Sequence, residues 1–319
     1  MITTAARQTV TWLMDFHNRT VLFRVGDFIF VTYGLIVAWA FCSGLALAAW
    51  YYGAIGLDPV AMVNATVLLF LPGVLIGARG FSVLLDGTAI FRSPIRTLLK
   101  PGYMLHGGVF GGVVAMAGYA RFAGVALLPI MDAYAIAMPL GEAICRLGCF
   151  VYGCCFGIPT DGPVSVCYHS EDSKVVRTRP ELRGVPLHPA QVYATAAHTL
   201  QFLILLALLP FIEHSGTLAG LYMITHPIIR VILERFRLDD RGRLGVLTHT
   251  NIYSALQFVA GTVLITLAGG WATRPMLDWT GKLTTVLTTP SALALWVVLA
   301  IVAALAFGLH YKKVGNWVD

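Results

Sequence analysis

Charged side chains are scarce in this sequence. They make up 12% of the 319 residues, whereas hydrophobic residues make up 57% and the mean hydropathy is +0.76. Soluble domains carry about 25% charged residues, so the composition excludes an ordinary soluble globule. No internal repeat of useful length is evident. Residues 1–26 carry charges throughout, so we expect no cleavable signal peptide.

The sequence contains long runs of apolar residues. A helix needs about 20 residues to cross a hydrocarbon core about 30 Å thick. Eight runs of suitable length lie at residues 28–52, 59–78, 103–120, 123–147, 190–212, 216–236, 250–271 and 291–311. They are continuous rather than alternating, which favours helices over barrel strands. The sequence therefore predicts an all-α polytopic membrane protein with about seven to eight transmembrane helices and a small extramembrane head.

The polar stretches divide the chain into three parts. Residues 1–27 are predicted to be an N-terminal interfacial segment. Residues 28–271 form a transmembrane domain that includes a basic arm at 79–102 and the head at 148–189. Residues 272–319 add a connector and an extra transmembrane helix. The net charge of +6 comes from basic residues in short loops between spans, so the expected partner is anionic membrane lipid and not nucleic acid.

His106 is one of the ionisable residues that fall inside a predicted span. A charge near the bilayer centre costs about 3 kcal/mol or more, so such residues usually face a cavity. Gly107 and Gly108 follow His106, and their lack of side chains would let a substrate approach the imidazole closely. This favours a general base or hydrogen-bond donor at a membrane cavity. The alternative is a histidine bonded to a neighbouring carbonyl.

The fourth span carries Asp132, Glu142 and Arg146. Glu142 and Arg146 are four residues apart in the order that stabilises a helix, and Asp132 lies deeper in the span. These residues are candidates for a functional site. The alternative is an internal ion pair that only fixes helix packing.

The sixth span carries His226, Arg230 and Glu234. Their fourfold spacing places all three on one stripe of a helix. An arginine inside a span must be paired or must bind an anion, so Arg230 is a candidate ligand for a negatively charged group. A purely structural stripe is the alternative.

Cysteines gather where the fourth span meets the head. Five of the six cysteines in the chain are Cys145, Cys149, Cys154, Cys155 and Cys167. Their spacing matches no zinc-knuckle pattern, so we expect no metal. A disulfide on an oxidising face, or inert packing thiols, is favoured. A reactive thiolate beside Arg146 remains a further alternative.

Five short motifs occur in an order that resembles the prolipoprotein diacylglyceryl transferase family, over residues 22–271. They are Tyr33-Gly34, His106-Gly107-Gly108, Arg146-Leu147-Gly148-Cys149-Phe150 with Gly153 and Gly157, His188-Pro189-Ala190-Gln191-Val192-Tyr193, and Arg230 with Glu234. The resemblance implies transfer of the diacylglyceryl group of phosphatidylglycerol to the lipobox cysteine of a prolipoprotein. Glycerol 1-phosphate would be released, and no metal or organic cofactor would be needed.

The same resemblance implies roles for individual residues. Arg146 and Arg230 would hold the lipid phosphate through their planar guanidinium groups. His106 would assist the thiol proton, and Tyr33 and Glu234 would order the site. The residues expected to bind substrate are Gly107, Gly108, Asp132, Cys149, Cys154 and Gly157.

Four positions differ from the family pattern. Cys149 and Tyr152 stand where the family usually has asparagine, Cys154 where it has glutamate, and Ala194 where an acid follows the tyrosine. These differences motivate an alternative hypothesis, a divergent phospholipid-dependent transferase with a different acceptor. A transporter is disfavoured because the sequence contains no inverted repeat with broken helices.

The expected location is the bacterial cytoplasmic (inner) membrane. With eight spans, the N-terminus, both excursions and most basic residues share one face, which the positive-inside rule would place in the cytoplasm. The resemblance instead implies an outward-facing active site, because exported prolipoproteins are the acceptors. We expect the head on the outer face, since several arginines on that face would serve a lipid phosphate, although those at 174–183 and 241–243 would not.

Overall fold

The computed structural model describes residues 16–85, 105–238, 243–244, 247–268, 277–280 and 283–316. They fall into two compact units. The first unit comprises Met1–Gly44, Tyr134–Arg274 and Val298–Asp319, and the second comprises Leu45–Ala133 and Pro275–Val297. Helices occupy all eight predicted runs. Among the residues that the structure describes, six helices are long and apolar enough to cross a membrane, so the chain is a multi-pass, mostly helical membrane protein.

The count of spanning helices is lower than the predicted seven to eight. The six are α2 (Thr32–Ala54), Pro59–Leu84, α8 (Leu127–Tyr152), Ala190–Phe211, Thr250–Leu267 and α14 (Pro290–Gly308). The helices at the third and sixth runs, α7 (Leu105–Ala123) and α11 (Thr217–Glu234), fall outside this set. In α11 the stripe of His226, Arg230 and Glu234 lowers the hydropathy.

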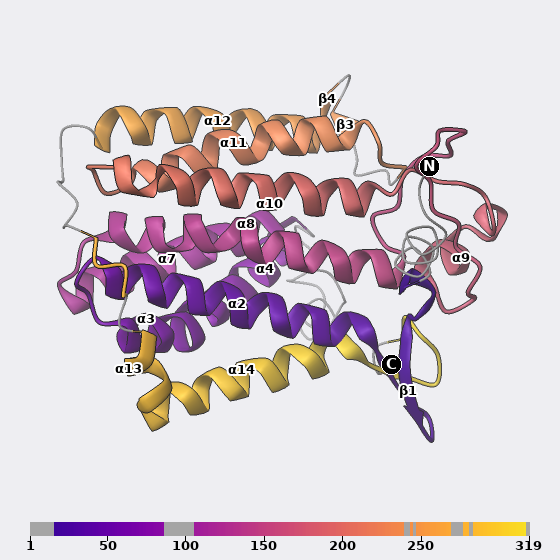
Figure 1. Ribbon diagram of the computed structural model, residues 1–319, viewed down its shortest axis with the longest axis horizontal. Helices are drawn as coiled ribbons and strands as arrows, with labels where there is room; N and C mark the ends of the chain where they lie inside the picture. The colour runs from indigo at the N-terminus through magenta and orange to yellow at the C-terminus, as the bar shows by residue number, and fades with distance from the viewer. Residues whose placement is uncertain are drawn as a thin grey trace, which may run out of the picture. The chain divides into compact units, whose positions relative to one another are not determined.

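In the first unit, α11 packs against α10 (Ala190–Leu208) and α12 (His249–Ala268), as Figure 1 shows. A 3-10 turn, η4 (Leu209–Phe211), ends α10. Gly220 on α11 and Gly261 on α12 let the helices approach, since a Cβ on Gly261 would lie 2.8 Å from the Gly220 carbonyl oxygen. Close contact through small residues is the usual way that helices associate in lipid.

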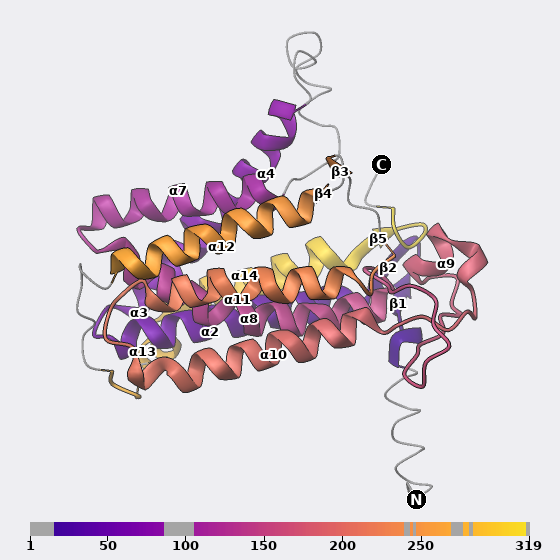
Figure 2. The ribbon, with the colours of Figure 1, turned by 90° about the horizontal axis from the view of Figure 1, so that it is seen from above.

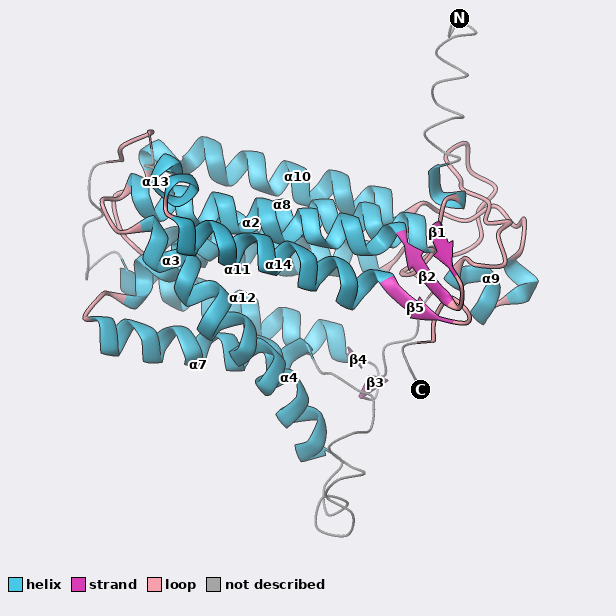
Figure 3. Ribbon diagram, turned by 90° about the horizontal axis from the view of Figure 1, so that it is seen from below, coloured by secondary structure: helices cyan, strands magenta, loops and turns pink. Residues whose placement is uncertain are grey.

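A small sheet in the first unit is a feature that the sequence did not predict. It has the order β1-β2-β5, with β1 at Val21–Val25, β2 at Phe28–Val31 and β5 at Leu309–Tyr311, all antiparallel (Figure 3). Residues 28–31 and 309–311 had been assigned to the first and last spans, so those two boundaries were wrong. A short apolar run fits a strand as well as a helix end, and Gly26 provides the turn between β1 and β2 with a φ of +57°.

The extra C-terminal helix is closely tied to the start of the chain. A Cβ on Gly34, near the start of α2, would collide with the backbone of Ala304 and Gly308 on α14. Strand β5 follows α14 directly and pairs with β2. In the first unit, α14 therefore packs against α2 at the end that carries Tyr33.

The head begins at Gly153, because α8 continues to Tyr152 and beyond the predicted start at 148. It contains α9 (Lys174–Thr178) and a 3-10 turn, η3 (Pro180–Leu182). Its apolar core consists of Phe150, Phe156, Val166, Tyr168, Val175, Val176, Leu182 and Leu187. Burial raises the pKa of Tyr168, so its hydroxyl stays protonated and donates to the Phe150 carbonyl over 3.0 Å.

The second unit is built around two closely packed helices, α4 (Leu71–Leu85) and α7 (Figure 2). It also contains α3 (Pro59–Ala65), a π-helical turn η2 (Thr66–Phe70) and α13 (Leu283–Thr288). Asp58 caps α3 by accepting a hydrogen bond from the Val60 amide over 2.8 Å. A short hairpin, β3 (Arg243–Leu244) and β4 (Leu247–Thr248), belongs to the first unit.

Of the predicted arm at 79–102, α4 covers the part up to Leu85, and residues 86–104 lie outside the described chain.

Candidate functional site

Helices α8 and α11 run in the same direction. Side chains of α10 contact α8 in reverse order, with Gln191 near Cys154 and His198 near Glu142. Contacts between α10 and α11 are also reversed, since Gln201 bonds Thr225 while the His198 ring lies over that of His226. Helix α10 is therefore antiparallel to both neighbours, and α8 and α11 both run toward the head.

A partly buried carboxylate, that of Glu142, joins the helices of this unit. The Glu142 oxygens lie 3.1 Å from His198 Nδ1 and 3.5 Å from His226 Nε2. Tyr222 donates its hydroxyl hydrogen to Glu142 Oε1 over 3.2 Å. His198 is 2% exposed and Glu142 22%. One carboxylate from α8 thus holds side chains from α10 and α11 inside the unit.

Amide side chains orient the two histidines. Gln201 Oε1 lies 3.2 Å from His198 Nδ1, and Gln257 Oε1 lies 3.3 Å from His226 Nδ1. Gln201 also donates from Nε2 to Thr225 Oγ1 over 2.9 Å. The network therefore extends to α12 and fixes the ring positions from both sides.

Arg146 and Arg230 each lie one helical turn beyond the contact between Glu142 and His226. Because α8 and α11 are parallel, both arginines are displaced by about 6 Å toward the head. Arg230 lies four residues from the last residue of α11, and Arg146 six from the last residue of α8. The Arg146 and Arg230 side chains thus project from neighbouring helices at a similar distance from the head.

Arg146 is paired with a thiol and not with an acid. Its Nη1 donates to Cys155 Sγ over 3.6 Å, and Glu142 attracts it from one turn away. Among the described residues no carboxylate oxygen lies within ion-pair distance of Arg146. Glu142 and Arg146 therefore do not form the packing ion pair that was the alternative for this span, because the carboxylate is bound by Tyr222 and the histidines.

Arg230 and Glu234, which their spacing placed on one stripe of the helix, form an ion pair. Arg230 Nη2 lies 3.2 Å from Glu234 Oε2, and the side chains are 13% and 20% exposed. Glu234 therefore restrains the guanidinium near the head end of α11.

Tyr33 lies against the last turns of α8. A Cβ on Gly148 would lie 2.8 Å from the Tyr33 ring, so this glycine makes room for it. The Tyr33 ring lies 5.4 Å from that of Tyr152. The structure thus brings Tyr33 to the same helix end as Arg146.

The cysteines at this end are free thiols. All six cysteines of the chain are unbridged, so the predicted disulfide alternative is not what the structure shows. The Sγ atoms of Cys149, Cys154 and Cys155 lie within 4.8 Å of one another.

The predicted glycines are explained by backbone packing. A Cβ on Gly157 would lie 2.8 Å from the Phe236 carbonyl oxygen and would also collide with His188. The absence of a side chain at Gly157 therefore lets this segment of the head pass close to the chain that follows α11. Gly107 and Gly108 face α4, where a Cβ on Gly107 would collide with Gly77 and Phe81. A role of these glycines in binding substrate stays a prediction.

Two other predicted residues lie in the second unit. Asp132 is fully buried within α8. His106 is the second residue of α7, and its side chain lies outside the described part of the structure. Their roles as substrate-binding residue and proton acceptor stay predictions.

Sequence reasoning missed His198, Tyr222 and Gln191. His198 is an ionisable residue inside an apolar run, the signal that drew attention to His106, and the same criterion would have found it. Gln191 lies in the fourth motif and donates from Nε2 to the Cys154 carbonyl over 2.7 Å. Only the structure shows that the Gln191 side-chain amide holds the backbone turn at Cys154.

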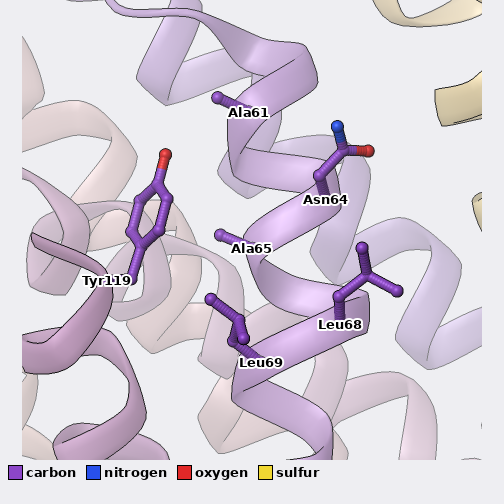
Figure 4. Close-up of a pocket in the computed structure, with 6 residues that line it drawn as sticks. All are labelled: Ala61, Asn64, Ala65, Leu68, Leu69 and Tyr119. Carbon is purple, nitrogen blue, oxygen red and sulfur yellow. The ribbon is translucent and has the colours of Figure 1, made fainter. Parts of the chain in front are cut away.

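The second unit has an apolar pocket of about 330 Å³, shown in Figure 4. It is lined by Ala61, Asn64, Ala65, Leu68, Leu69 and Tyr119. No charged side chain lines it, so it offers nothing to hold a phosphate, and we place the candidate site at the head end of α8 and α11.

Comparisons with known proteins agree with the motif order. A family model described as prolipoprotein diacylglyceryl transferase matches residues 20–267. A phosphatidylglycerol–prolipoprotein diacylglyceryl transferase of Clostridium tetani is 25% identical over 76% of this chain and 95% of its own length. Enzymes of the same name from Rhizobium leguminosarum bv. trifolii and Methylocella silvestris are 28% and 27% identical, covering 75% and 74% of this chain and 83% and 86% of theirs.

Proposed function

Because the chain belongs to the prolipoprotein diacylglyceryl transferase family, we propose that it transfers the diacylglyceryl group of phosphatidylglycerol to the lipobox cysteine thiol of a prolipoprotein, the first step of lipoprotein maturation. The observation that carries this proposal is the placement of Arg146 and Arg230. They leave two parallel helices at one level, about 6 to 9 Å inside the head end, which suits a lipid phosphate at the membrane interface.

The reaction is a displacement at a glycerol carbon. The thiol sulfur forms a bond to this carbon, and the bond from the carbon to the phosphate oxygen breaks. The leaving glycerol 1-phosphate takes the electron pair, so negative charge develops on its oxygen. Fixed cations aimed at that oxygen stabilise the transition state more than the ground state. Guanidinium groups suit this task because they bind phosphate oxygens in pairs and remain charged.

The remaining residues act around this pair of arginines. Glu234 orients Arg230 through their 3.2 Å contact. Glu142 fixes α11 to α8 and so sets the separation of the two arginines. Tyr33 borders the site from α2. His106 is the residue that we propose to accept the thiol proton, and Asp132, Cys149 and Cys154 are proposed to contact substrate.

We place the protein in the bacterial cytoplasmic membrane with the head on the outer side, where exported prolipoproteins arrive. This placement is testable with Glu171→Cys, since the Glu171 side chain in the head is 82% exposed. A membrane-impermeant maleimide is expected to label this variant in intact spheroplasts. Labelling only after the membrane is opened would place the head in the cytoplasm and exclude exported acceptors.

The activity is testable with purified protein, phosphatidylglycerol and a synthetic lipobox peptide. We expect a peptide mass increase equal to one diacylglyceryl group. The matched control is the same peptide with serine in place of cysteine, which should remain unmodified. An unmodified cysteine peptide, with active protein of known lipid content, would contradict the proposal.

A second candidate is a phospholipid-dependent transferase with another acceptor. The observation that favours it is the thiol cluster at Cys149 and Cys154, two positions where the family usually has polar side chains. Ala194, where the family has an acid, is buried in α10. Release of glycerol phosphate without modification of the peptide would favour this candidate.

A further inference from the structure

The turn after α8 brings three thiols together. Gly153 has a φ of +74° and Cys155 one of +57°, so the chain reverses and returns Cys154 and Cys155 toward the last turn of the helix. The amides of Gly153 and Cys154 donate to the Cys149 carbonyl over 2.9 and 3.1 Å. The three Sγ atoms consequently lie within 4.8 Å of one another.

The turn is held from outside as well. Gln191, which is 1% exposed, donates from Nε2 to the Cys154 carbonyl over 2.7 Å. A Cβ on Gly153 would collide with Ser173, so the head packs directly on the turn. The thiol positions are therefore set by the backbone and by a buried amide before any ligand binds.

Packing alone does not explain the residue at position 155. A φ of +57° strains an L-residue with a side chain and is usually occupied by glycine or asparagine. The Cys155 side chain is only partly buried, so it contributes little to the core. Its Sγ instead lies beside Cys149 and Cys154 and accepts a hydrogen bond from Arg146.

The geometry fits a metal ion. Zinc–sulfur bonds of about 2.3 Å place the sulfurs of a tetrahedral site about 3.8 Å apart, so each pair needs to close by about 1 Å or less. Thiolates are the ligands that soft metals prefer. The sequence spacing of four residues and then none does not match a zinc knuckle, but here the reversal at Gly153, and not a knuckle, sets the geometry.

The charges of the three thiolates and of Arg146 indicate whether the ion is monovalent or divalent. Three thiolates and one divalent cation carry a net charge of minus one, and the Arg146 guanidinium, which donates to Cys155 over 3.6 Å, brings the total to zero. A monovalent ion would leave a negative charge at a partly buried site, where charges must be compensated. Cys149 is buried, whereas Cys154 and Cys155 are partly exposed beyond the end of α8, which gives an ion a route of entry.

We propose that Cys149, Cys154 and Cys155 hold one soft divalent metal ion of the zinc class, with Arg146 compensating its charge. Three protein ligands leave one position of a tetrahedral ion for a water molecule or another ligand. The ion would join the last turn of α8 to the head beside the proposed phosphate site. The proposal shares Arg146, Cys149 and Cys154 with the proposed transferase site, but it rests on the thiol positions and is tested by metal binding and not by transfer.

The test uses the full-length protein, purified anaerobically in detergent, stripped with a chelator and kept reduced. Titration with Cd²⁺, followed by thiolate-to-metal charge-transfer absorption, is expected to saturate at one ion per chain. A large excess of Zn²⁺, needed because Cd²⁺ binds thiolates more tightly, should lower this absorption. Cys149→Ser and Cys154→Ser are expected to weaken Cd²⁺ binding at least about a hundredfold. Cys42→Ser and Cys167→Ser are the matched controls and should bind like the wild type.

The variant Cys155→Gly distinguishes the loss of a metal ligand from a general loss of folding. Glycine adopts a φ of +57° without strain, so this variant should unfold at the wild-type temperature or above and still lose Cd²⁺ binding about a hundredfold. Wild-type affinity in Cys155→Gly would overturn the proposal. So would no saturable band in the wild type, or a disulfide between two of the three cysteines in the anaerobic sample. Peptide modification is assayed separately, so failure of the transferase proposal leaves this result interpretable.

Discussion

Replacing Arg230 with alanine is expected to reduce the rate of diacylglyceryl transfer by at least about a hundredfold. Removal of one fixed donor from a developing oxyanion typically costs a factor of 10² to 10³, roughly, and a guanidinium supplies more than one donor. The side chain is 13% exposed, so little water replaces it. The measurement is the initial rate of peptide modification under saturating peptide.

Two matched variants separate this effect from general damage. Arg235→Ala removes an exposed arginine just beyond the same helix and should leave the rate within about twofold, since exposed charges contribute little. Arg230→Lys keeps the charge but loses the planar fork, so an intermediate rate is expected. Full activity of Arg230→Ala would remove Arg230 from the mechanism.

The arginines should also act together. If Arg146 and Arg230 hold one phosphate, the losses caused by Arg146→Lys and Arg230→Lys will not multiply in the double variant, because groups that share a ligand couple. Independent losses that multiply would mean that the two side chains serve different groups.

Replacing Glu142 with alanine is expected to lower the free energy of unfolding by about 3 kcal/mol or more. The change removes the acceptor of the Tyr222 hydroxyl and the carboxylate beside His198 and His226. Each buried polar group left without a partner costs about 1 to 3 kcal/mol. The thermal unfolding temperature in a fixed detergent reports this loss.

Glu142→Gln and Glu181→Ala calibrate the measurement. The glutamine keeps an acceptor for Tyr222, so its destabilisation should be smaller. Glu181 pairs with Arg179 at 3.7 Å on the surface of the head, where it is 62% exposed, and its removal should cost about 1 kcal/mol or less. An unfolding temperature of Glu142→Ala equal to that of Glu181→Ala would show that the buried network does not hold the helices.

The helices were predictable because backbone groups in lipid have no water to bond with and must form hydrogen bonds within the protein. Each run of about 20 apolar residues must bond within itself, and a helix indeed lies at every predicted run. The strand at Phe28–Val31 was missed because a short apolar run fits the start of a helix as well as a strand. Its pairing with β1 is local, through the turn at Gly26. Its second partner, β5, is remote, since Asp27 and Tyr311 beside this pairing are 284 residues apart, and no local pattern records such a partner.

Spacing along one helix predicted that His226, Arg230 and Glu234 share a stripe, and Arg230 and Glu234 do make contact. Glu142 and Arg146 have the more favourable order, but partners from α10 and α11 bind the Glu142 carboxylate instead. Such partners from other helices cannot be read from spacing along one helix. The thiol cluster depends on a backbone reversal at Gly153, so the spacing of the cysteines in the sequence does not show that three of them meet.

The most direct test of the account follows the phosphate and the thiol in one reaction. Phosphatidylglycerol labelled in its headgroup glycerol is incubated with the purified protein and the lipobox peptide, and the products are analysed by tandem mass spectrometry. We predict a diacylglyceryl thioether on the cysteine and one equivalent of labelled glycerol phosphate per modified peptide. Label retained on the peptide, or thioether formed without release of glycerol phosphate, would contradict displacement at the glycerol carbon.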